Sequence, residues 1–275
     1  MPSYNIKELQ GRLLEILLAF DKVCREHNLR YCICGGTLLG AVRHGGFIPW
    51  DDDLDCSMPR PDYEKFIAHC KEWLPPHLEF VCAENDPLYP LPFGKIQDSR
   101  TTLIERRHLY YLGGCYIDIF PFDGHSDNAL LRRWRCSRYN YMSKMLYFVH
   151  RDPWRHGHGP SSWLPLAARR MHSMHSLQKS IRKLITSEDY DKSSLASSFT
   201  DGAGKVLPKD VIGVFKPYMF EGHEVMGIAD YDRYLRCMYG DTYMTPPPEA
   251  DRFQHNFDYL DLNNPYRDYR PEEKD

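Results

Sequence analysis

The chain has 275 residues, 42% of them hydrophobic and 13% aromatic, which is enough to bury a large core and excludes an intrinsically disordered protein. Its formal net charge of -3 is near neutral and gives no reason to expect a nucleic-acid partner. Nine cysteines at irregular spacing, with no C-x-x-C pair, indicate buried, reduced thiols in a cytoplasmic protein.

Residues 1–127 predict a mixed α/β unit. Apolar residues recur every three to four positions from Ile6 to Cys24, which is the spacing of an amphipathic helix. A second helix is expected over 62–73, because Pro61 favours the first position of a helix. A short apolar strand ends at the pair Gly35 and Gly36. The strand candidates are 29–34, 54–59, 78–84, 95–106 and 114–124. These elements predict the fold class α/β (α+β), a mixed sheet with flanking helices.

Residues 128–200 predict a basic helical insertion. From Leu130 to Ile185 there are 12 Lys or Arg residues and one acid. One helical face is expected to hold Met171, Met174, Leu177, Ile181 and Leu184. A solvated helical face would explain the basic residues, and so would capture of an anionic acceptor or a membrane surface.

The last part of the chain, 201–275, is expected to pack back on the first unit. A polar loop over 188–205 precedes it, and strand and then helix patterns follow. Residues 266–275 predict a mobile tail. The N-terminus lacks a signal-peptide pattern and no apolar window is long enough to span a membrane, so we expect a cytoplasmic location, with peripheral contact at the inner face of the membrane as an option.

The run "WDDDLD" at residues 50–55 allows three interpretations. A solvated, charged turn is the default for such a run. A calcium loop would use Asp51, Asp53 and Asp55 as ligands, but the template requires Gly where Cys56 stands and Glu where Asp62 stands. The third interpretation is a magnesium site at a strand, because alternation places Asp53 and Asp55 on one face.

A magnesium site also explains the neighbouring residues. Two glycines ahead of the aspartates allow backbone N–H groups to approach a phosphate without a Cβ in the way. A third carboxylate usually comes from an adjacent strand, and Asp118 fits because the flanking Ile117 and Ile119 should point into the core. The cofactor expected is therefore Mg²⁺, or Mn²⁺ in its place.

The segment "CGGTLLGAVRHGGFIPWDDDLDCSMPRPDYEKF" resembles the signature of the LicD proteins, whose eukaryotic relatives are the fukutin group. The stretches "KIQDSRTTLIE", "GCYIDIFPFDG" and "YLRCMYGDTYMTPPP" match further blocks in the expected order. The middle, about 130 to 200, carries no such resemblance. The resemblance implies a nucleotidyltransferase-like fold and transfer of a phosphorylated alcohol from a CDP-activated donor to a sugar hydroxyl.

The donor implied by the bacterial members is CDP-choline, and the acceptor a teichoic-acid, lipopolysaccharide or lipid-linked glycan. The fukutin group implies CDP-ribitol, and CDP-glycerol is a related alternative. A true nucleotidyltransferase that uses a nucleoside triphosphate would need the same aspartates. A non-catalytic binding protein is the rival from another class, although it would not need clustered acids.

The resemblance implies roles for residues in the matching segments. Asp53 and Asp55 are expected to bind the metal, with Asp51 in support or at a second ion. Asp118 is expected either as the third ligand or as the general base for the acceptor hydroxyl. The residues expected at the donor phosphates are Gly35, Gly36, Thr37, Arg43, His44 and Lys95.

Further candidates lie later in the chain. Tyr239 and Asp241 follow a predicted helix and fit either a helix cap or the site, and His255 is another candidate for the site. A choline head group would need aromatic faces. The candidates for such a cage are Trp50, Tyr110, Tyr111 and Tyr116.

Overall fold

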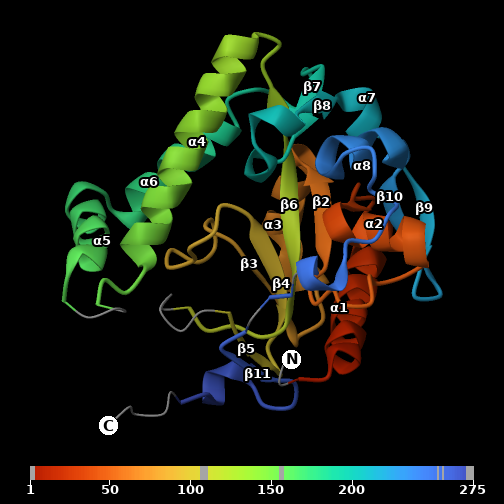
Figure 1. The fold of residues 1–275 in the computed structure, drawn as a ribbon, viewed down its shortest axis with the longest axis horizontal. Coiled ribbons are helices and arrows are strands. Elements are labelled where there is room, and N and C mark those ends of the chain that lie inside the picture. The colour runs from red at the N-terminus through yellow and green to blue at the C-terminus, as the bar shows by residue number, and fades with distance from the viewer. Residues whose placement is uncertain (1–3, 106–110, 155–157, 253, 256, 271–275) are drawn as a thin grey trace.

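The computed structural model describes residues 4–105, 111–154, 158–252, 254–255 and 257–270, and it confirms the predicted mixed α/β architecture. The strands are β1 (Cys32–Ile33), β2 (Asp55–Pro59), β3 (Leu78–Val81), β4 (Gly94–Asp98), β5 (Thr102–Ile104), β6 (Tyr116–His125), β7 (Leu195–Ser197), β8 (Leu207–Pro208), β9 (Phe215–Phe220), β10 (His223–Ile228) and β11 (Tyr259–Asp261). The central sheet has the order β3-β4-β6-β2-β1-β10-β9 (Figure 1). The candidate 95–106 is thus two strands, β4 and β5, separated by a turn.

Eight α-helices are found among the described residues. They are α1 (Ile6–Glu26), α2 (Gly35–His44), α3 (Arg60–Trp73), α4 (Ala129–His150), α5 (Pro160–Met171), α6 (Met174–Ile185), α7 (Lys209–Ile212) and α8 (Tyr231–Tyr239). α1 and α3 pack on the sheet side by side, with the rings of Phe20 and Phe66 5.4 Å apart. α4, α5 and α6 stand beside the sheet (Figure 1).

Strand pairing in the middle of the sheet positions the acidic residues. β2 pairs with β6 in parallel and places Asp55 opposite Asp118. Ile117 and Ile119 alternate with Asp118 and are fully buried, which confirms their predicted place in the core. β4 runs antiparallel to β6 and places Lys95 opposite Asp118. Three adjacent strands therefore bring two carboxylates and one ammonium group together.

A second hydrophobic cluster lies among the helices of the basic segment. It contains Leu177, Ile181 and Leu184 of α6, packed with residues of α4. The prediction that Met171 shares one helical face with α6 was wrong, because α5 ends at Met171 and α6 is a separate helix. Ser173 caps α6 by accepting a hydrogen bond from Ser176 N–H. The predicted polar loop over 188–205 also contains β7.

The C-terminal part packs back on the first unit. β9, β10 and α8 confirm the predicted order of strands and then helix, and β10 pairs with β1. β11 pairs with β5. The start of the predicted mobile tail is held, because Tyr266 Oη donates to Glu79 at 2.8 Å and Arg267 forms an ion pair with the same carboxylate. Residues 271–275 lie outside the described residues.

The cysteines have the environment that their irregular spacing suggests. All nine lie within the described residues and are free thiols. Eight are buried and Cys237 is half-buried. Burial raises the pKa of thiols such as Cys32 and Cys56, which keeps them protonated and unreactive.

His125 links β6 to β7 and gives the fold a predicted sensitivity to acid. Its Nε2 lies 2.9 Å from Ser197 Oγ, and its ring stacks on Phe199 with a centroid distance of 4.4 Å. Burial and the nearby Arg132 and Arg135 lower the pKa of His125 to about 4. The unfolded chain therefore binds this proton more tightly, and the stability contribution present above pH ~6.5 is lost as the pH falls towards 4.

Between pH 7 and pH 4, His125 is expected to account for a loss of about 3 kcal/mol in the free energy of unfolding. Urea unfolding of the wild type and His125→Gln at several pH values measures it. The difference in stability between the two proteins should shrink as the pH falls. His223→Gln, at an exposed histidine, is the matched control. A difference that stays constant with pH would contradict the assignment.

Candidate active site

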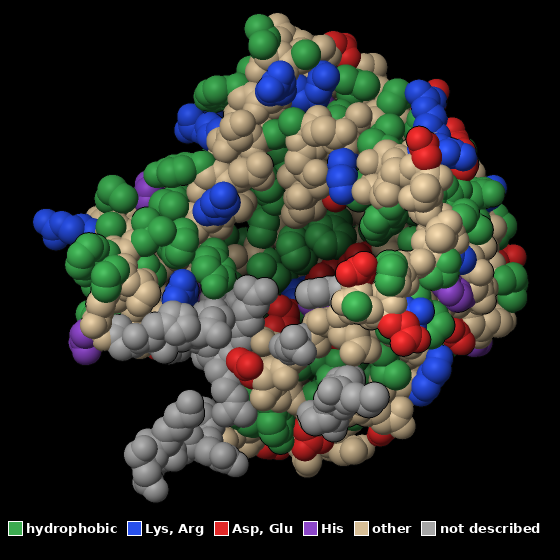
Figure 2. Space-filling model, in the orientation of Figure 1, with side chains coloured by type: hydrophobic (Ala, Val, Ile, Leu, Met, Phe, Trp, Pro, Cys, Tyr) green, Lys and Arg blue, Asp and Glu red, His purple; other side chains and the backbone are tan. Residues whose placement is uncertain are grey.

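A cleft of about 460 Å³ opens beside the start of α2 and the aspartate run. Figure 2 shows the molecule hollowed near its centre, with acidic side chains at the edge of the hollow. The residues of the sequence prediction that line the cleft are Gly36, Arg43, Trp50, Asp51, Asp53, Asp55, Tyr239 and His255. The cleft is also lined by residues of the segment after α8, which are Thr242, Tyr243, Thr245, Pro247 and Asp251.

The aspartate run alternates between the cleft and the interior. Asp51, Asp53 and Asp55 line the cleft, whereas Leu54 and Cys56 are buried in the core. This alternation confirms the shared face of Asp53 and Asp55, although β2 itself begins at Asp55. A solvated turn does not describe such a run. The strand also stands where a calcium loop would have to bend.

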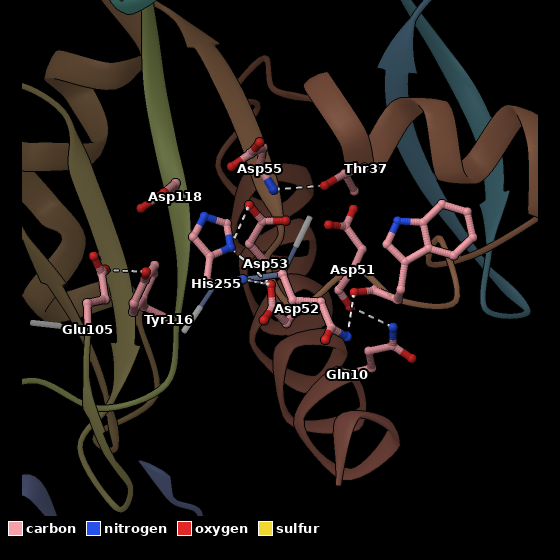
Figure 3. A network of polar contacts seen from close by, with 12 residues as sticks. Gln10, Thr37, Asp51, Asp52, Asp53, Asp55, Glu105, Tyr116, Asp118 and His255 are labelled. Atoms are coloured by element: carbon pink, nitrogen blue, oxygen red, sulfur yellow. Dashed lines mark hydrogen bonds and ion pairs between the residues drawn. The ribbon is translucent and has the colours of Figure 1, made fainter. Parts of the chain in front are cut away.

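Asp52 has a structural position that the sequence analysis missed. It is 3% exposed and accepts hydrogen bonds from Tyr4 Oη at 2.6 Å and from His255 N–H at 3.1 Å. The Nδ1 atom of His255 also lies 2.9 Å from Asp52 and 3.8 Å from Asp53 (Figure 3). Asp52 thus ties the N-terminal and C-terminal segments to the edge of the cleft.

The start of α2 lies directly against two of the cleft carboxylates. Gly35 has a φ of +54°, and a Cβ there would lie 3.0 Å from Asp55 Oδ2. A Cβ at Gly36 would lie 3.1 Å from Asp51 Oδ2. The first turn of a helix presents N–H groups without intrahelical acceptors, and its dipole favours negative charge. Gly35 N–H, however, donates to Tyr234 Oη at 3.1 Å.

Burial and mutual repulsion make these carboxylates hard to ionise. Burial, together with repulsion from Asp53, raises the pKa of Asp51 to about 8. The pKa of Asp55 is also raised, first by burial and then by Asp53 and Asp118. For Asp118 burial outweighs the attraction of Lys95 and raises the pKa to about 7. Such a cluster is stabilised by a bound cation.

The chemistry of these groups fits Mg²⁺. Carboxylate oxygens are hard ligands, and Mg²⁺ commonly takes one or two carboxylates together with waters and substrate phosphates. Oδ1 of Asp118 is buried and lacks a hydrogen-bond partner among the described residues. No group of three His, Cys, Asp or Glu side chains in the described ranges is arranged to hold a metal. The three ligands expected from the sequence, Asp53, Asp55 and Asp118, therefore stay a prediction.

Lys95 and Glu105 form a polar cluster beside Asp118. Lys95 is buried, and its Nζ lies 2.5 Å from Glu105 Oε1 and 3.7 Å from Asp118 Oδ1. Tyr116 Oη also donates to Glu105 Oε1 (Figure 3). Burial raises the pKa of Glu105, but the contacts with Lys95 and Tyr116 outweigh it and lower that pKa. Lys95 is thus an interior residue, and Glu105 is a site candidate that the sequence analysis missed.

The remaining predicted residues have varied positions. Thr37 is buried, and its Oγ1 accepts a hydrogen bond from Asp55 N–H at 2.8 Å, so it orients β2. Arg43 lines the cleft and donates to the carbonyl of Tyr243 at 3.1 Å. His44 is adjacent to Arg43 but does not line the cleft. Asp241 is exposed and forms an ion pair with Arg236 at 2.9 Å outside the cleft.

The aromatic candidates already have neighbours. The guanidinium of Arg252 lies 4.2 Å from the ring centroid of Trp50. Lys95 Nζ lies 3.3 Å from the ring centroid of Tyr116. Tyr111 and Tyr116 line a small cavity with Glu105, and Tyr116 is two residues before Asp118 on β6. Tyr110 lies outside the described residues.

Of the two site residues that the sequence analysis missed, Asp52 had a sequence pattern that indicates its position and Glu105 had none. The alternation that turns Asp53 and Asp55 towards the cleft also turns Asp52 inwards, so a buried role for Asp52 was readable. Glu105 had no comparable signal, because its partner Lys95 lies on another strand. The cleft wall after α8 depends on long-range folding, which local patterns do not encode.

A family model and curated relatives match this chain. The family model described as "LicD/FKTN/FKRP, nucleotidyltransferase domain" matches residues 28–172. The match includes α4 and α5, where the sequence analysis found no resemblance. The lipopolysaccharide cholinephosphotransferase LicD of Haemophilus influenzae is 27% identical over 263 residues, which cover 93% of this chain and 97% of that protein.

Two further relatives match only a short part of the chain. The ribitol 5-phosphate transferase FKRP of Homo sapiens is 42% identical over 45 residues, which are 16% of this chain and 8% of FKRP. An uncharacterized protein of Rickettsia typhi is 42% identical over 60 residues, 22% of this chain and 19% of its own length.

Proposed function

The chain belongs to the LicD/FKTN/FKRP family and is a phosphotransferase of that family, and we propose that it transfers phosphocholine from CDP-choline to a hydroxyl group of a cell-surface glycan, with release of CMP. The similarity to a lipopolysaccharide cholinephosphotransferase along nearly the whole chain carries this proposal. It supports a lipopolysaccharide-type acceptor ahead of a teichoic-acid precursor. The short match to FKRP keeps CDP-ribitol as the second donor.

The cleft supplies groups suited to a nucleoside diphosphate donor. The first turn of α2 and Arg43 would bind the phosphates, because helix N-terminal amides and an Arg fork both suit phosphate oxygens. Asp53, Asp55 and Asp118 would hold Mg²⁺. When bound, the ion would neutralise the charge on the diphosphate as CMP leaves.

Asp118 has two candidate roles that a single variant separates. Asp118→Asn should lose both turnover and stabilisation by Mg²⁺ when Asp118 is a ligand. If Mg²⁺ still stabilises the variant but turnover is lost, the carboxylate acts as the general base that takes the proton of the acceptor hydroxyl. Thermal unfolding with and without Mg²⁺ distinguishes the two results.

The small cavity beside Asp118 suits a cationic alcohol. The group attached to the transferred phosphate must lie close to the reacting phosphorus. Lys95 lines this cavity, and its Nζ lies 3.7 Å from Asp118 Oδ1. The walls of the cavity include two tyrosine rings, the carboxylate of Glu105 and the ammonium group of Lys95. A quaternary ammonium group would displace Lys95 from the ring of Tyr116 and from Glu105. Aromatic faces and a carboxylate recognise a quaternary ammonium group without hydrogen bonds.

Glu105→Gln is therefore expected to raise KM for CDP-choline by about tenfold, which corresponds to 1.4 kcal/mol. KM for CDP-glycerol, which lacks the positive charge, should change much less. Steady-state kinetics of CMP release with both donors measures the difference. Glu72→Gln, at an exposed carboxylate on α3, is the matched control. An equal change in KM for both donors would show that Glu105 does not recognise the alcohol.

The donor assignment is tested by incubating the protein with Mg²⁺, an acceptor glycan and one of four compounds: CDP-choline, CDP-ribitol, CDP-glycerol or CTP. The proposal predicts fastest CMP release from CDP-choline. Fastest release from CDP-ribitol would move the donor to the second candidate. Pyrophosphate release from CTP alone would show nucleotidyl transfer instead.

A further inference from the structure

α5 buries small side chains and exposes large apolar ones, which is the reverse of an ordinary surface helix. It buries the small side chains of Ser162, Pro165 and Ala168 against its neighbours. Its large apolar residues face outwards, with Trp163 68%, Leu164 49% and Met171 64% exposed. A surface helix normally buries its large apolar residues and exposes polar ones. The outer face of α5 therefore suits an apolar partner.

α4 continues this apolar surface. Leu130 is 79%, Trp134 53% and Tyr141 51% exposed, and their spacing along the helix places them on one stripe. The stripe reaches α5, because Tyr141 Oη lies 3.3 Å from Nε2 of His172, the residue that follows Met171. We call the six residues the projecting surface: Leu130, Trp134, Tyr141, Trp163, Leu164 and Met171. Figure 2 shows hydrophobic and basic side chains together on the part of the molecule formed by α5.

Positive charge accompanies the exposed apolar groups. The stretch from Leu130 to Ile185 has 12 Lys or Arg residues and one acid, although the whole chain has a net charge of -3. Arg170 is exposed next to Met171, and the guanidinium of Arg138 lies 5.4 Å from the ring centroid of Trp134. Within the described ranges, no helix has the length and apolar character needed to cross a bilayer.

We propose that the projecting surface docks the protein on a bilayer that contains anionic phospholipids. Tryptophan and leucine on one helix face, with arginines among them, are typical of helices that lie in the membrane interface. The basic residues would be attracted to anionic head groups, and the apolar side chains would enter the acyl boundary. A protein partner is less well matched, because the core of a protein interface is depleted of charged residues.

The test is flotation of the full chain with vesicles of phosphatidylcholine alone or with phosphatidylglycerol added. Binding is expected only to the anionic vesicles and is expected to weaken as salt rises. Trp163→Ala combined with Leu164→Ala should reduce binding at least about tenfold. Met219→Ala, at a comparably exposed residue on β9, should leave it unchanged. Arg170→Glu should also weaken binding, and Lys22→Glu on α1 is its control.

These variants change exposed side chains, and equal melting temperatures would establish that they fold. No binding to anionic vesicles at low salt overturns the proposal. Binding that depends on Arg170 but not on Trp163 and Leu164 also overturns it, because the apolar surface would then have no part. Self-association of the lipid-free protein that Trp163→Ala abolishes would assign the surface to a second copy of the chain. Lipid binding is read without substrate, so its failure leaves the proposed transfer reaction untouched.

Discussion

Asp55→Asn is expected to lower turnover by more than the roughly 10–100-fold typical of residues that only orient a metal ligand, and to raise the stability of the metal-free protein. Asp55 adjoins Asp118 across β2 and β6 and lies against Gly35. Asparagine keeps the shape of the side chain but removes a charge that Asp53 and Asp118 repel. Loss of activity and gain of stability should therefore occur together.

The gain should depend on pH in a defined direction. The pKa of Asp55 is raised in the folded state, so its contribution to stability is present below its ordinary pKa and is lost as the pH rises through the raised value. The melting temperature of Asp55→Asn without Mg²⁺ should thus exceed that of the wild type more at pH 8 than at pH 5. Mg²⁺ should stabilise the wild type but not the variant.

Asp191→Asn, at an exposed aspartate away from the cleft, is the matched control and should change neither property. Turnover of Asp55→Asn close to that of the wild type would remove Asp55 from the reaction. A lower melting temperature at every pH would show that its carboxylate has a stabilising structural role instead.

Gly35→Ala is the second substitution with a large expected effect. Its φ of +54° costs a residue with a side chain about 1–2 kcal/mol, and the added methyl group would lie 3.0 Å from Asp55 Oδ2. The carboxylate must then move, and a shift of about 1 Å in a catalytic group can cost on the order of 10²-fold in rate. Both the free energy of unfolding and turnover are expected to fall.

Substitutions at two other glycines distinguish the cost of the positive φ from the displacement of a carboxylate. Gly36→Ala has no unfavourable φ but places a methyl group 3.1 Å from Asp51 Oδ2, so it should reduce turnover with little change in stability. Gly11→Ala in α1 meets no atom within 4 Å and should be neutral or stabilise the helix by about 0.5–1 kcal/mol. Full activity of Gly35→Ala would contradict the close contact between α2 and Asp55.

Local patterns predicted much of the fold that positions the cleft. The alternation at Asp53 and Asp55 gave the face of β2, and the isoleucines around Asp118 gave the matching face of β6. Strand alternation is a local property of the backbone, so a single sequence encodes it well. Helix α1 was equally readable from its apolar spacing, and α3 from Pro61 at its start.

Contacts between distant segments were not readable in the same way. The pairing of Lys95 with Glu105, and of Asp52 with Tyr4 and His255, joins residues whose neighbourhood only the folded chain defines. Met171 was predicted on one helical face with the apolar residues of α6, but a helix break at Ser173 separates it from them and it is exposed. A period of 3.6 residues identifies a face without saying where a helix ends.

In the proposed reaction, the carboxylates of β2 and β6 form a metal-dependent site for phospho-alcohol transfer. Mass spectrometry of an acceptor glycan, after incubation with CDP-choline and the protein, would detect the transferred group itself. We expect a glycan that has gained phosphocholine, with an equal amount of CMP, in the presence of Mg²⁺ and not with EDTA or Asp55→Asn. A glycan that gained a cytidylyl group, or one that gained phosphocholine equally well with Asp55→Asn, would contradict the proposed reaction.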